Sequence, residues 1–352
     1  MDKILLVHAS FGEGHKRAAC ALKNFLKAEC VDLLDFSYPF IKKIYLYLYV
    51  LTTERVHFLW NFLFVSTENR FMHYFWERVQ EFIFFPFFEY LRKTKPKVVV
   101  ATHFFPLSFV AKLKKEYDIK LIVIVTDLRA HPFWSHKEVD AYFVPLEETK
   151  NDLIKCGIDP ARITTGYVAL RDGFLQPLDE MGLRKKFAFD SRPVILFMSS
   201  LRGNFPFFSE ILNRIKDKFN IFVIYGKNLG LKAYLESFKM DNLKFLPSSE
   251  EIWEIFQISS VLVTKPGGLT TFEGTYKRKT FIFLRYIPGQ EKENMKILIK
   301  HNIGRFVRNP DDFMEALNYL IRREAELKAD YPIKFNDIRP VLKETIEKIC
   351  RL

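Results

Sequence analysis

KILLVHASFGEGHKRAACALKNFLK, residues 3–27, is the segment from which the architecture of the chain can be read. Ile4 to Val7 form a short apolar run, which is typical of a strand buried on both faces of a parallel sheet. A glycine-containing loop follows over residues 8–14, and the apolar side chains of residues 16–27 recur at helical spacing. Strand, loop and helix together form one βα unit.

The same alternation continues along the chain. Apolar strand segments separated by helical stretches lie at residues 98–101, 121–125, 141–144, 194–198, 221–225, 243–246, 261–264 and 280–284. Such alternation predicts parallel sheets covered on both faces, and 352 residues suffice for about two domains. We therefore predict an α/β fold of two doubly wound domains, at 1–170 and 193–352, joined by a linker at 171–192. The amphipathic end, residues 338–350, can pack on either domain.

The composition narrows the function classes. Charged residues at 27% and hydrophobic residues at 49% exclude a fibre or a disordered chain. The net charge of +12 favours anionic partners, but the basic residues are dispersed and no nucleic-acid motif accompanies them. The four cysteines lack metal-ligand spacing, and the first apolar run is too short for a signal peptide. We expect reduced thiols, a cytoplasmic location and no nucleic acid.

Residues 36–90 interrupt the alternation with 20 aromatic residues in 55. Their longest apolar stretch, residues 44–65, contains Glu54, Arg55 and His57, and a charge at the bilayer centre costs roughly 2.5–3.5 kcal/mol. A membrane span is therefore disfavoured. Two interpretations remain open: helices that lie in the membrane interface, or aromatic residues that fill a core.

The loop SFGEGH, residues 10–15, lies between the first strand and its helix. In open α/β sheets this position borders the ligand crevice, and Gly12 and Gly14 allow an acceptor to approach the backbone. The loop lacks the third glycine of a dinucleotide fingerprint and the Gly-Lys-Ser/Thr of a P-loop. A helix N-terminus keeps a histidine neutral, so His15 is a candidate general base; the alternative is a capping or packing histidine.

The segment VTDLRAHPFW, residues 125–134, leaves another strand at its carboxyl end. Asp127, His131 and Trp134 together suggest an acceptor site on the same crevice. The alternative is structural: an Asx turn at Asp127, an exposed His131 and a core Trp134.

In the second domain, KPGGLTTFE at residues 265–273 joins a strand to a helix. Gly267 and Gly268 expose backbone N–H groups at the helix start, and Thr270 and Thr271 add hydroxyls, an arrangement that suits a diphosphate. Glu273 lies one turn further on and could accept hydrogen bonds from a ribose diol. The alternative is an ordinary helix capped by Thr270.

A hydrogen-bonding cluster follows at IPGQEKEN, residues 287–294. Gln290, Glu291 and Asn294 lie at a strand-to-helix turn and suit the reading of sugar hydroxyls, although they could also be a solvated helix start. No Asp-x-Asp metal motif occurs in the chain. Lys265 or Arg202 and the helix N-terminus could stabilise a departing diphosphate in place of a magnesium ion, so we expect neither a metal nor a cofactor.

These motifs resemble glycosyltransferase family 28. The resemblance runs from about residue 3 to about residue 305, and the nearest branch contains the monogalactosyldiacylglycerol synthases and the processive diacylglycerol glucosyltransferases. The motifs that carry it are 12–15 followed by Ala18-Ala19, Thr126-Asp127 with His131 and Trp134, 264–268 with Thr271 and Glu273, and 287–291 with Asn294.

The resemblance implies a GT-B fold, in which two Rossmann-like domains face a central cleft. It implies a UDP-hexose donor on the C-terminal domain, a lipid acceptor on the N-terminal domain, and inversion at the anomeric carbon. It assigns His15 as the general base, Asp127 to the acceptor-side motif, Trp134 to the lipid headgroups, Gly267, Gly268 and Thr271 to the diphosphate loop, Glu273 to the ribose, and Gln290 and Glu291 to the sugar.

Two segments depart from the family pattern. The glycine-rich turn after the first strand of the second domain is MSSLRGN here, at residues 198–204, which makes Arg202 a candidate diphosphate ligand. The Gly-Ile-Pro-Val before the linker is Gly166-Tyr167-Val168-Ala169 here.

From these observations we expect an inverting hexosyltransferase that moves glucose or galactose from a UDP-sugar to diacylglycerol or a related lipid alcohol. It would act as a peripheral protein on the inner face of the cell membrane, where the aromatic insert and the basic surplus favour anionic lipid. The alternatives are another GT-B chemistry, such as undecaprenyl-linked sugar transfer or UDP-sugar epimerisation, and a non-catalytic UDP-sugar-binding membrane protein.

Overall fold

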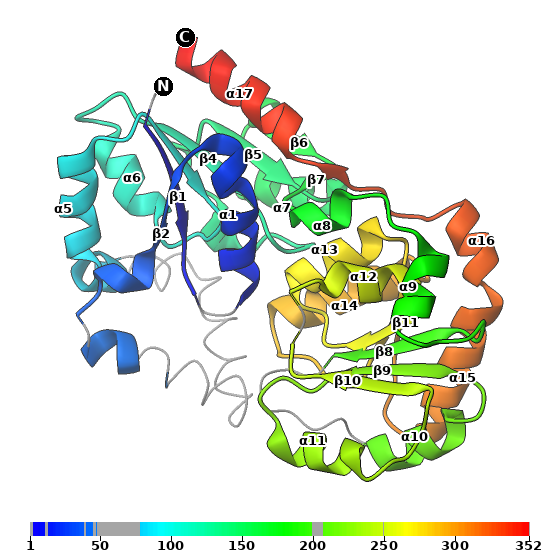
Figure 1. Ribbon diagram of the computed structural model, residues 1–352. Helices are drawn as coiled ribbons and strands as arrows, with labels where there is room; N and C mark the ends of the chain where they lie inside the picture. Colours follow the sequence, from blue (N-terminus) through cyan, green and yellow to red (C-terminus); the bar gives the residue numbers. More distant parts are fainter. Residues whose placement is uncertain are drawn as a thin grey trace.

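The computed structural model describes residues 3–10, 13–38, 40–44, 47, 78–198, 207–248 and 250–351. They form two lobes, each built on a parallel six-stranded sheet with helices on both faces (Figure 1). The predicted α/β class with two doubly wound domains is confirmed.

The first sheet has the strand order β2-β1-β3-β4-β5-β6. Its strands are short and mostly buried, as the apolar runs predict. Their bounds are β1 (Ile4–His8), β2 (Glu29–Asp32), β3 (Val98–Ala101), β4 (Lys120–Ile124), β5 (Ala141–Val144) and β6 (Ile163–Thr165). The helices of this lobe are α1 (Glu13–Leu26), α5 (Phe85–Thr94), α6 (Leu107–Leu113) and α7 (Glu147–Lys155). Two apolar clusters fill the lobe, one of which contains Leu6, Ala18 and Leu22 of β1 and α1.

The second sheet has the order β10-β9-β8-β11-β12-β13. Its strands are β8 (Val194–Met198), β9 (Asn220–Ile224), β10 (Leu243–Leu246), β11 (Ser259–Thr264), β12 (Thr280–Phe283) and β13 (Gly304–Phe306). The helices are α10 (Phe208–Ile215), α11 (Leu229–Glu236), α12 (Ile252–Ile258), α13 (Gly268–Tyr276), α14 (Gln290–Lys300) and α15 (Pro310–Arg322). The five predicted strands, β8 to β12, lie within two residues of their predicted positions, whereas β13 was not predicted.

The chain crosses between the lobes twice, and the two crossings pair with each other. β7 (Tyr167–Val168) forms a parallel ladder with β14 (Asn336–Asp337). Between the first crossing and β8 lie α8 (Asp172–Leu175) and α9 (Glu180–Lys186), which pack against α12, so residues 171–192 are part of the second lobe's structure. After α16 (Glu324–Ala329), the last helix, α17 (Arg339–Arg351), returns to the first lobe and packs beside α1 (Figure 1).

Most of the aromatic insert, including Trp60 and Trp76, lies outside the described residues. Its described ends contain both kinds of aromatic residue. Phe84 and Phe87 are buried in the core of the first lobe, whereas Phe40 and Phe82 are 70% and 76% exposed. Among the residues described here, no helix is long and apolar enough to cross a bilayer.

Candidate functional site between the lobes

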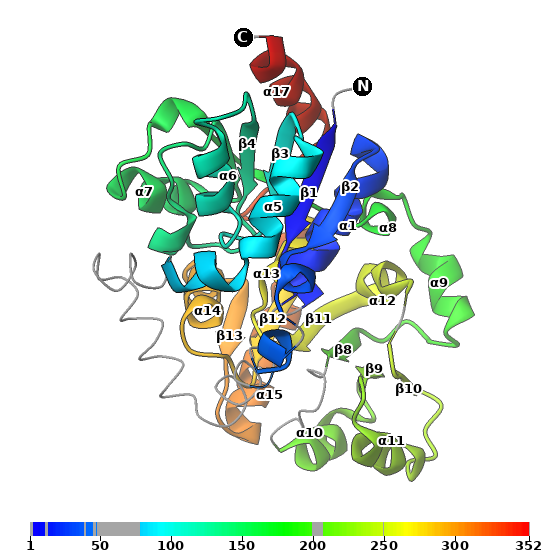
Figure 2. The same ribbon diagram turned by 90° about the vertical axis from the view of Figure 1, so that its left-hand side faces the viewer.

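The candidate site lies where the carboxyl ends of the two sheets approach each other. In a doubly wound sheet the ligand crevice forms at the point where the strand order reverses, which is between β1 and β3 in the first lobe and between β8 and β11 in the second. The loops after β4 and β11 and the starts of α1, α13 and α14 meet at this level (Figure 2). Gly12 and Arg202, both predicted site residues, lie outside the described residues.

His15 lies in the first turn of α1, and its ring is held by the loops after β3 and β4. Its Nδ1 is 2.8 Å from the carbonyl oxygen of Thr102 and 2.9 Å from Oγ1 of Thr126. A carbonyl can only accept, so the contact with Thr102 is a hydrogen bond when Nδ1 carries the proton. The neutral ring then has its lone pair on Nε2. Burial lowers the pKa of His15 to about 4, which keeps the imidazole neutral at physiological pH.

The rings of His103 and Trp134 lie next to the imidazole of His15. The ring centroids of His15 and His103 are 4.6 Å apart, in an edge-to-face arrangement, and Trp134 lies 6.4 Å from both. His103 is not among the predicted site residues. The signal was present, because Thr102-His103 follows β3 directly and β3 borders the switch point of the first sheet.

Trp134 and His131 are placed differently from the expected lipid contact. Trp134 is fully buried, as the alternative core interpretation had it. Its ring lies beside the rings of His15 and His103 and does not face a headgroup in this arrangement. His131 precedes a short 3-10 helix at Pro132–Trp134, where its Nδ1 accepts the backbone N–H of Phe133. The alternative of an exposed His131 is wrong, because its side chain is buried.

Asp127 joins the two lobes. Its Oδ2 accepts a 2.7 Å hydrogen bond from Nε2 of Gln290, and its Oδ1 lies 3.3 Å from Nδ2 of Asn294. Burial raises the pKa of Asp127 to about 7, and the nearby Glu291 carboxylate adds to that effect, although the bond from Asn294 opposes it. The acceptor-side carboxyl and the amides expected to read a sugar are therefore paired with each other.

Asn294 uses its whole amide in this contact. Its Oδ1 accepts the backbone N–H of Leu128 at 2.8 Å, and its Nδ2 donates to the carbonyl of Pro266 at 3.1 Å as well as to Asp127. The side chain is fully buried, so the alternative of a solvated helix start is wrong for this residue. In this arrangement Asn294 links the second lobe to Asp127 and Leu128 of the first lobe through hydrogen bonds.

The loop before α13 approaches the first lobe closely. Gly267 is the N-cap and Gly268 the first helical residue, so the alternative in which Thr270 caps the helix is wrong. A Cβ placed on Gly268 would lie only 1.9 Å from the carbonyl oxygen of Thr126, which explains why glycine is needed there. Thr271 donates its hydroxyl to the carbonyl of Gly268 at 2.7 Å, whereas Thr270 is half-buried.

Three predicted charged site residues of the second lobe, Lys265, Glu291 and Glu273, each form an ion pair. Lys265 Nζ lies 2.8 Å from Oε1 of Glu291, whose Oε2 accepts the backbone N–H of Ile287. Glu273 is buried and forms a two-point ion pair with Arg171, through Nε at 2.6 Å and a terminal nitrogen at 2.7 Å. Burial raises the pKa of Glu273, and the Arg171 guanidinium opposes this shift. Both carboxylates are thus held in place next to the loop of α13.

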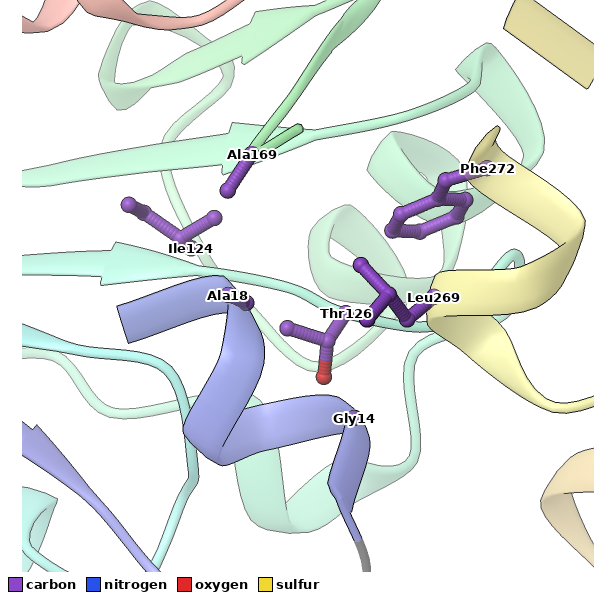
Figure 3. Close-up of a pocket in the computed structure, with 7 residues that line it drawn as sticks. All are labelled: Gly14, Ala18, Ile124, Thr126, Ala169, Leu269 and Phe272. Carbon is purple, nitrogen blue, oxygen red and sulfur yellow. The ribbon is translucent and has the colours of Figure 1, made fainter. Parts of the chain in front are cut away.

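A narrow apolar crevice continues the site between the lobes (Figure 3). Gly14 and Ala18 of α1 face Leu269 and Phe272 of α13 across it, and a Cβ on Gly14 would be 3.9 Å from Cβ of Leu269. Ile124, Thr126 and Ala169 complete the lining. The start of the helix that carries His15 therefore lies against the start of the helix that carries Gly268. No group of three His, Cys, Asp or Glu side chains that could hold a metal occurs among the described residues.

This chain is similar in sequence to known glycolipid synthases. Residues 15–167 match the family model of monogalactosyldiacylglycerol (MGDG) synthase. Processive diacylglycerol β-glucosyltransferases of Bacillus pumilus (strain SAFR-032) and Bacillus subtilis (strain 168) are each 25% identical to this chain, over 349 and 347 residues. These alignments cover 93% and 92% of this chain and 88% of each relative.

Solved structures confirm the fold. Acinetobacter baumannii MurG has a TM-score of 0.64 at 13% identity, with 98% of this chain and 99% of that chain covered. The UDP-GlcNAc 2-epimerase from Neisseria meningitidis bound to UDP-GlcNAc has a TM-score of 0.63 at 15% identity, with coverage of 98% and 100%. The arrangement of the lobes is thus the expected GT-B fold. The resemblance to glycosyltransferase family 28 is confirmed: this chain is similar to the MGDG synthase family model and to processive diacylglycerol glucosyltransferases.

Proposed function

We propose that the protein transfers a hexose from a UDP-sugar to the hydroxyl of diacylglycerol or a related membrane lipid alcohol, with inversion and with His15 as the general base. The observation that carries this proposal is the hydrogen bond between His15 Nδ1 and the carbonyl of Thr102, which leaves the Nε2 lone pair available as a base. The family model and the Bacillus relatives support the reaction class.

The reaction is a single displacement. The acceptor hydroxyl gives its proton to Nε2 of His15, and its oxygen bonds to the anomeric carbon as the bond from that carbon to the diphosphate breaks. UDP leaves with the bonding electron pair. The N-terminus of α13 at Gly267 and Gly268, with Lys265 beside it, would stabilise the charge that grows on the diphosphate. A metal ion is not part of this proposal.

Donor binding would replace the contact between the lobes. Asp127 occupies the amides of Gln290 and Asn294, so a hexose that uses these amides must displace the carboxyl. The released Asp127 would then accept a hydrogen bond from a substrate hydroxyl next to His15, since the adjacent Thr126 already contacts the imidazole. Glu273, held by Arg171, would accept from the ribose diol.

The acceptor would reach the site from a membrane surface. Large side chains at the described ends of the insert are exposed: Tyr38, Phe40, Tyr47, Phe82 and Phe85. Exposed aromatic rings favour the headgroup region, and the net charge of +12 favours anionic lipid. We propose that the protein binds the inner face of the cell membrane peripherally.

Transfer of radiolabel to lipid tests the proposal. The protein is incubated with labelled UDP-glucose or UDP-galactose and liposomes that contain diacylglycerol, and the lipid extract is separated by chromatography. Labelled glycolipid supports the proposal. A changed free nucleotide sugar would indicate epimerisation, label only on added undecaprenyl-linked acceptor would indicate that transfer, and binding without turnover would indicate a non-catalytic protein.

Two histidine variants test the base. His15→Ala is expected to lose transfer while it still binds UDP. His136→Ala is the matched control, because His136 is another half-buried histidine of the first lobe, and its Nδ1 accepts the backbone N–H of the nearby Glu138 at 3.3 Å. Full transfer activity in His15→Ala would refute the assignment of the base.

A further inference from the structure

His103 is a buried histidine that the proposed mechanism does not use. Its ring packs edge-to-face on His15, with centroids 4.6 Å apart and an interplanar angle of 72°. Phe104 and Phe105 pack on its other sides at 4.3 and 4.6 Å. Because His103 is only 4% exposed, the ring is confined between these neighbours and the imidazole of His15.

The backbone next to His103 sets the orientation of the base. The carbonyl of Thr102 accepts a hydrogen bond from Nδ1–H of His15, and the hydroxyl of Thr102 donates to the backbone carbonyl of His15 at 3.0 Å. Two consecutive residues therefore contact the base: Thr102 through hydrogen bonds and His103 through its ring. Thr102 fixes which nitrogen carries the proton, and the ring of His103 limits rotation of the imidazole about that hydrogen bond.

A backbone hydrogen bond fixes the tautomer of the His103 ring. Its Nδ1 accepts the backbone N–H of Phe105 at 3.2 Å, so the neutral ring carries its proton on Nε2. Protonation of both imidazoles would place two positive charges in contact within a buried site. Burial lowers the pKa of His103, and the neighbouring His15 and His8 lower it further. His8 lies at the end of β1, with its Nδ1 3.9 Å from Asp32.

We infer that His103 is a positioning residue that holds the imidazole of His15 with Nε2 directed at the acceptor hydroxyl. This inference rests on the proposed function, in which His15 is the base. General-base catalysis requires the nitrogen to lie within hydrogen-bond reach of the proton that it removes, so rotation of the ring costs rate even when both substrates are bound.

Two variants separate ring packing from other roles. His103→Ala removes the ring and opens space beside His15. His103→Phe keeps a ring of similar size but cannot accept from the N–H of Phe105. We expect His103→Ala to lower kcat by about tenfold to a hundredfold, with the KM for UDP-sugar nearly unchanged, and His103→Phe to restore much of kcat.

The state of His15 is measured independently of turnover. Nitrogen NMR of the labelled protein is expected to show a proton on Nδ1 of His15 in the wild type and in His103→Phe, and a mixture of tautomers in His103→Ala. In His103→Ala the acid limb of the pH–kcat profile should also move to higher pH, because water reaches His15. His136→Phe is the control, since it removes the same kind of bond outside the site.

The outcomes distinguish this inference from the proposed function. If His103→Ala keeps the kcat, the pH profile and the His15 tautomer of the wild type, the inference is wrong. If His103→Ala does not fold, as judged by circular dichroism, a His103→Phe protein with a mixed His15 tautomer overturns the inference equally. Full activity of His15→Ala would instead refute the base, while the nitrogen spectra would still decide whether His103 orients His15.

Discussion

Gly268→Ala is expected to hold the two lobes apart. The new Cβ would lie 1.9 Å from the carbonyl oxygen of Thr126, and ordinary contacts begin at 3.4 Å. The backbone of Thr126 therefore has to retreat by about 1.5 Å, the difference between these two distances. The clash is with backbone on both sides, so a change of side-chain rotamer cannot relieve it.

A displacement of this size breaks the hydrogen bonds that close the lobes. The bond from Leu128 to Asn294, at 2.8 Å, would exceed the range of a hydrogen bond. The bond from Gln290 to Asp127 would break as well, but donor binding replaces that bond in the proposed reaction, so its loss does not lower the rate. The unsatisfied Leu128 amide makes closure about 1–3 kcal/mol less favourable. The rate of a reaction that needs closed lobes should fall by at least about 5-fold.

Hydrogen exchange of the Leu128 amide measures closure without any donor present, which separates it from a direct effect of the new methyl group on donor binding. We expect fast exchange and weak transfer in Gly268→Ala. Gly267→Ala is the matched control, because a Cβ at Gly267 would lie 4.0 Å from Oε1 of Glu291, an ordinary contact. Wild-type protection of Leu128 together with wild-type transfer in Gly268→Ala would refute the reasoning.

Three further predictions concern charge and metal. The value of kcat/KM should fall partly as the pH drops through about 7, because Asp127 gains a proton there and loses an acceptor position, and fully near pH 4, because His15 is protonated there. The Asp127→Ala variant should retain only the lower step. A single step near pH 6.5 would contradict the pKa shifts of both residues. Glu273→Gln removes the buried carboxylate that pairs with the half-buried Arg171 and should cost about 3–5 kcal/mol in urea denaturation. Asp152→Asn, which breaks a two-point pair with a more exposed arginine, should cost clearly less, and equal losses would count against this account. Chelation with EDTA should leave transfer to liposomes unchanged, and a loss that magnesium restores would show that a metal stabilises the diphosphate.

Local sequence patterns predicted the elements well. The apolar runs located nine of the twelve strands of the two sheets within two residues, because a strand buried on both faces must be apolar along its whole length. The strands β2, β6 and β13 were not predicted, because each is short and contains only one or two apolar residues. The same patterns placed Gly14, His15, Asp127 and Gly268 at the carboxyl ends of strands, and the structure brings these four residues to the interface between the lobes.

Other site features depend on contacts between distant segments. Asn294 was expected to face a sugar, but its amide is saturated by Leu128, Asp127 and Pro266. Trp134 was expected near headgroups, but it is fully buried, because the segment that carries it folds back against the core. The position of His103 after β3 was visible in the sequence, but its ring contact with His15 was not.

The sequence by itself determined two parallel α/β domains, the loops that end their strands and the family resemblance, because periodicity and turn residues act over a few neighbouring positions. Only the tertiary structure decided which nitrogen of His15 carries the proton, that Arg171 pairs with Glu273, and that Asp127 meets Gln290 across the lobes. These contacts join residues 87 to 163 positions apart in the chain, and their strength depends on burial that arises only when the two lobes pack together.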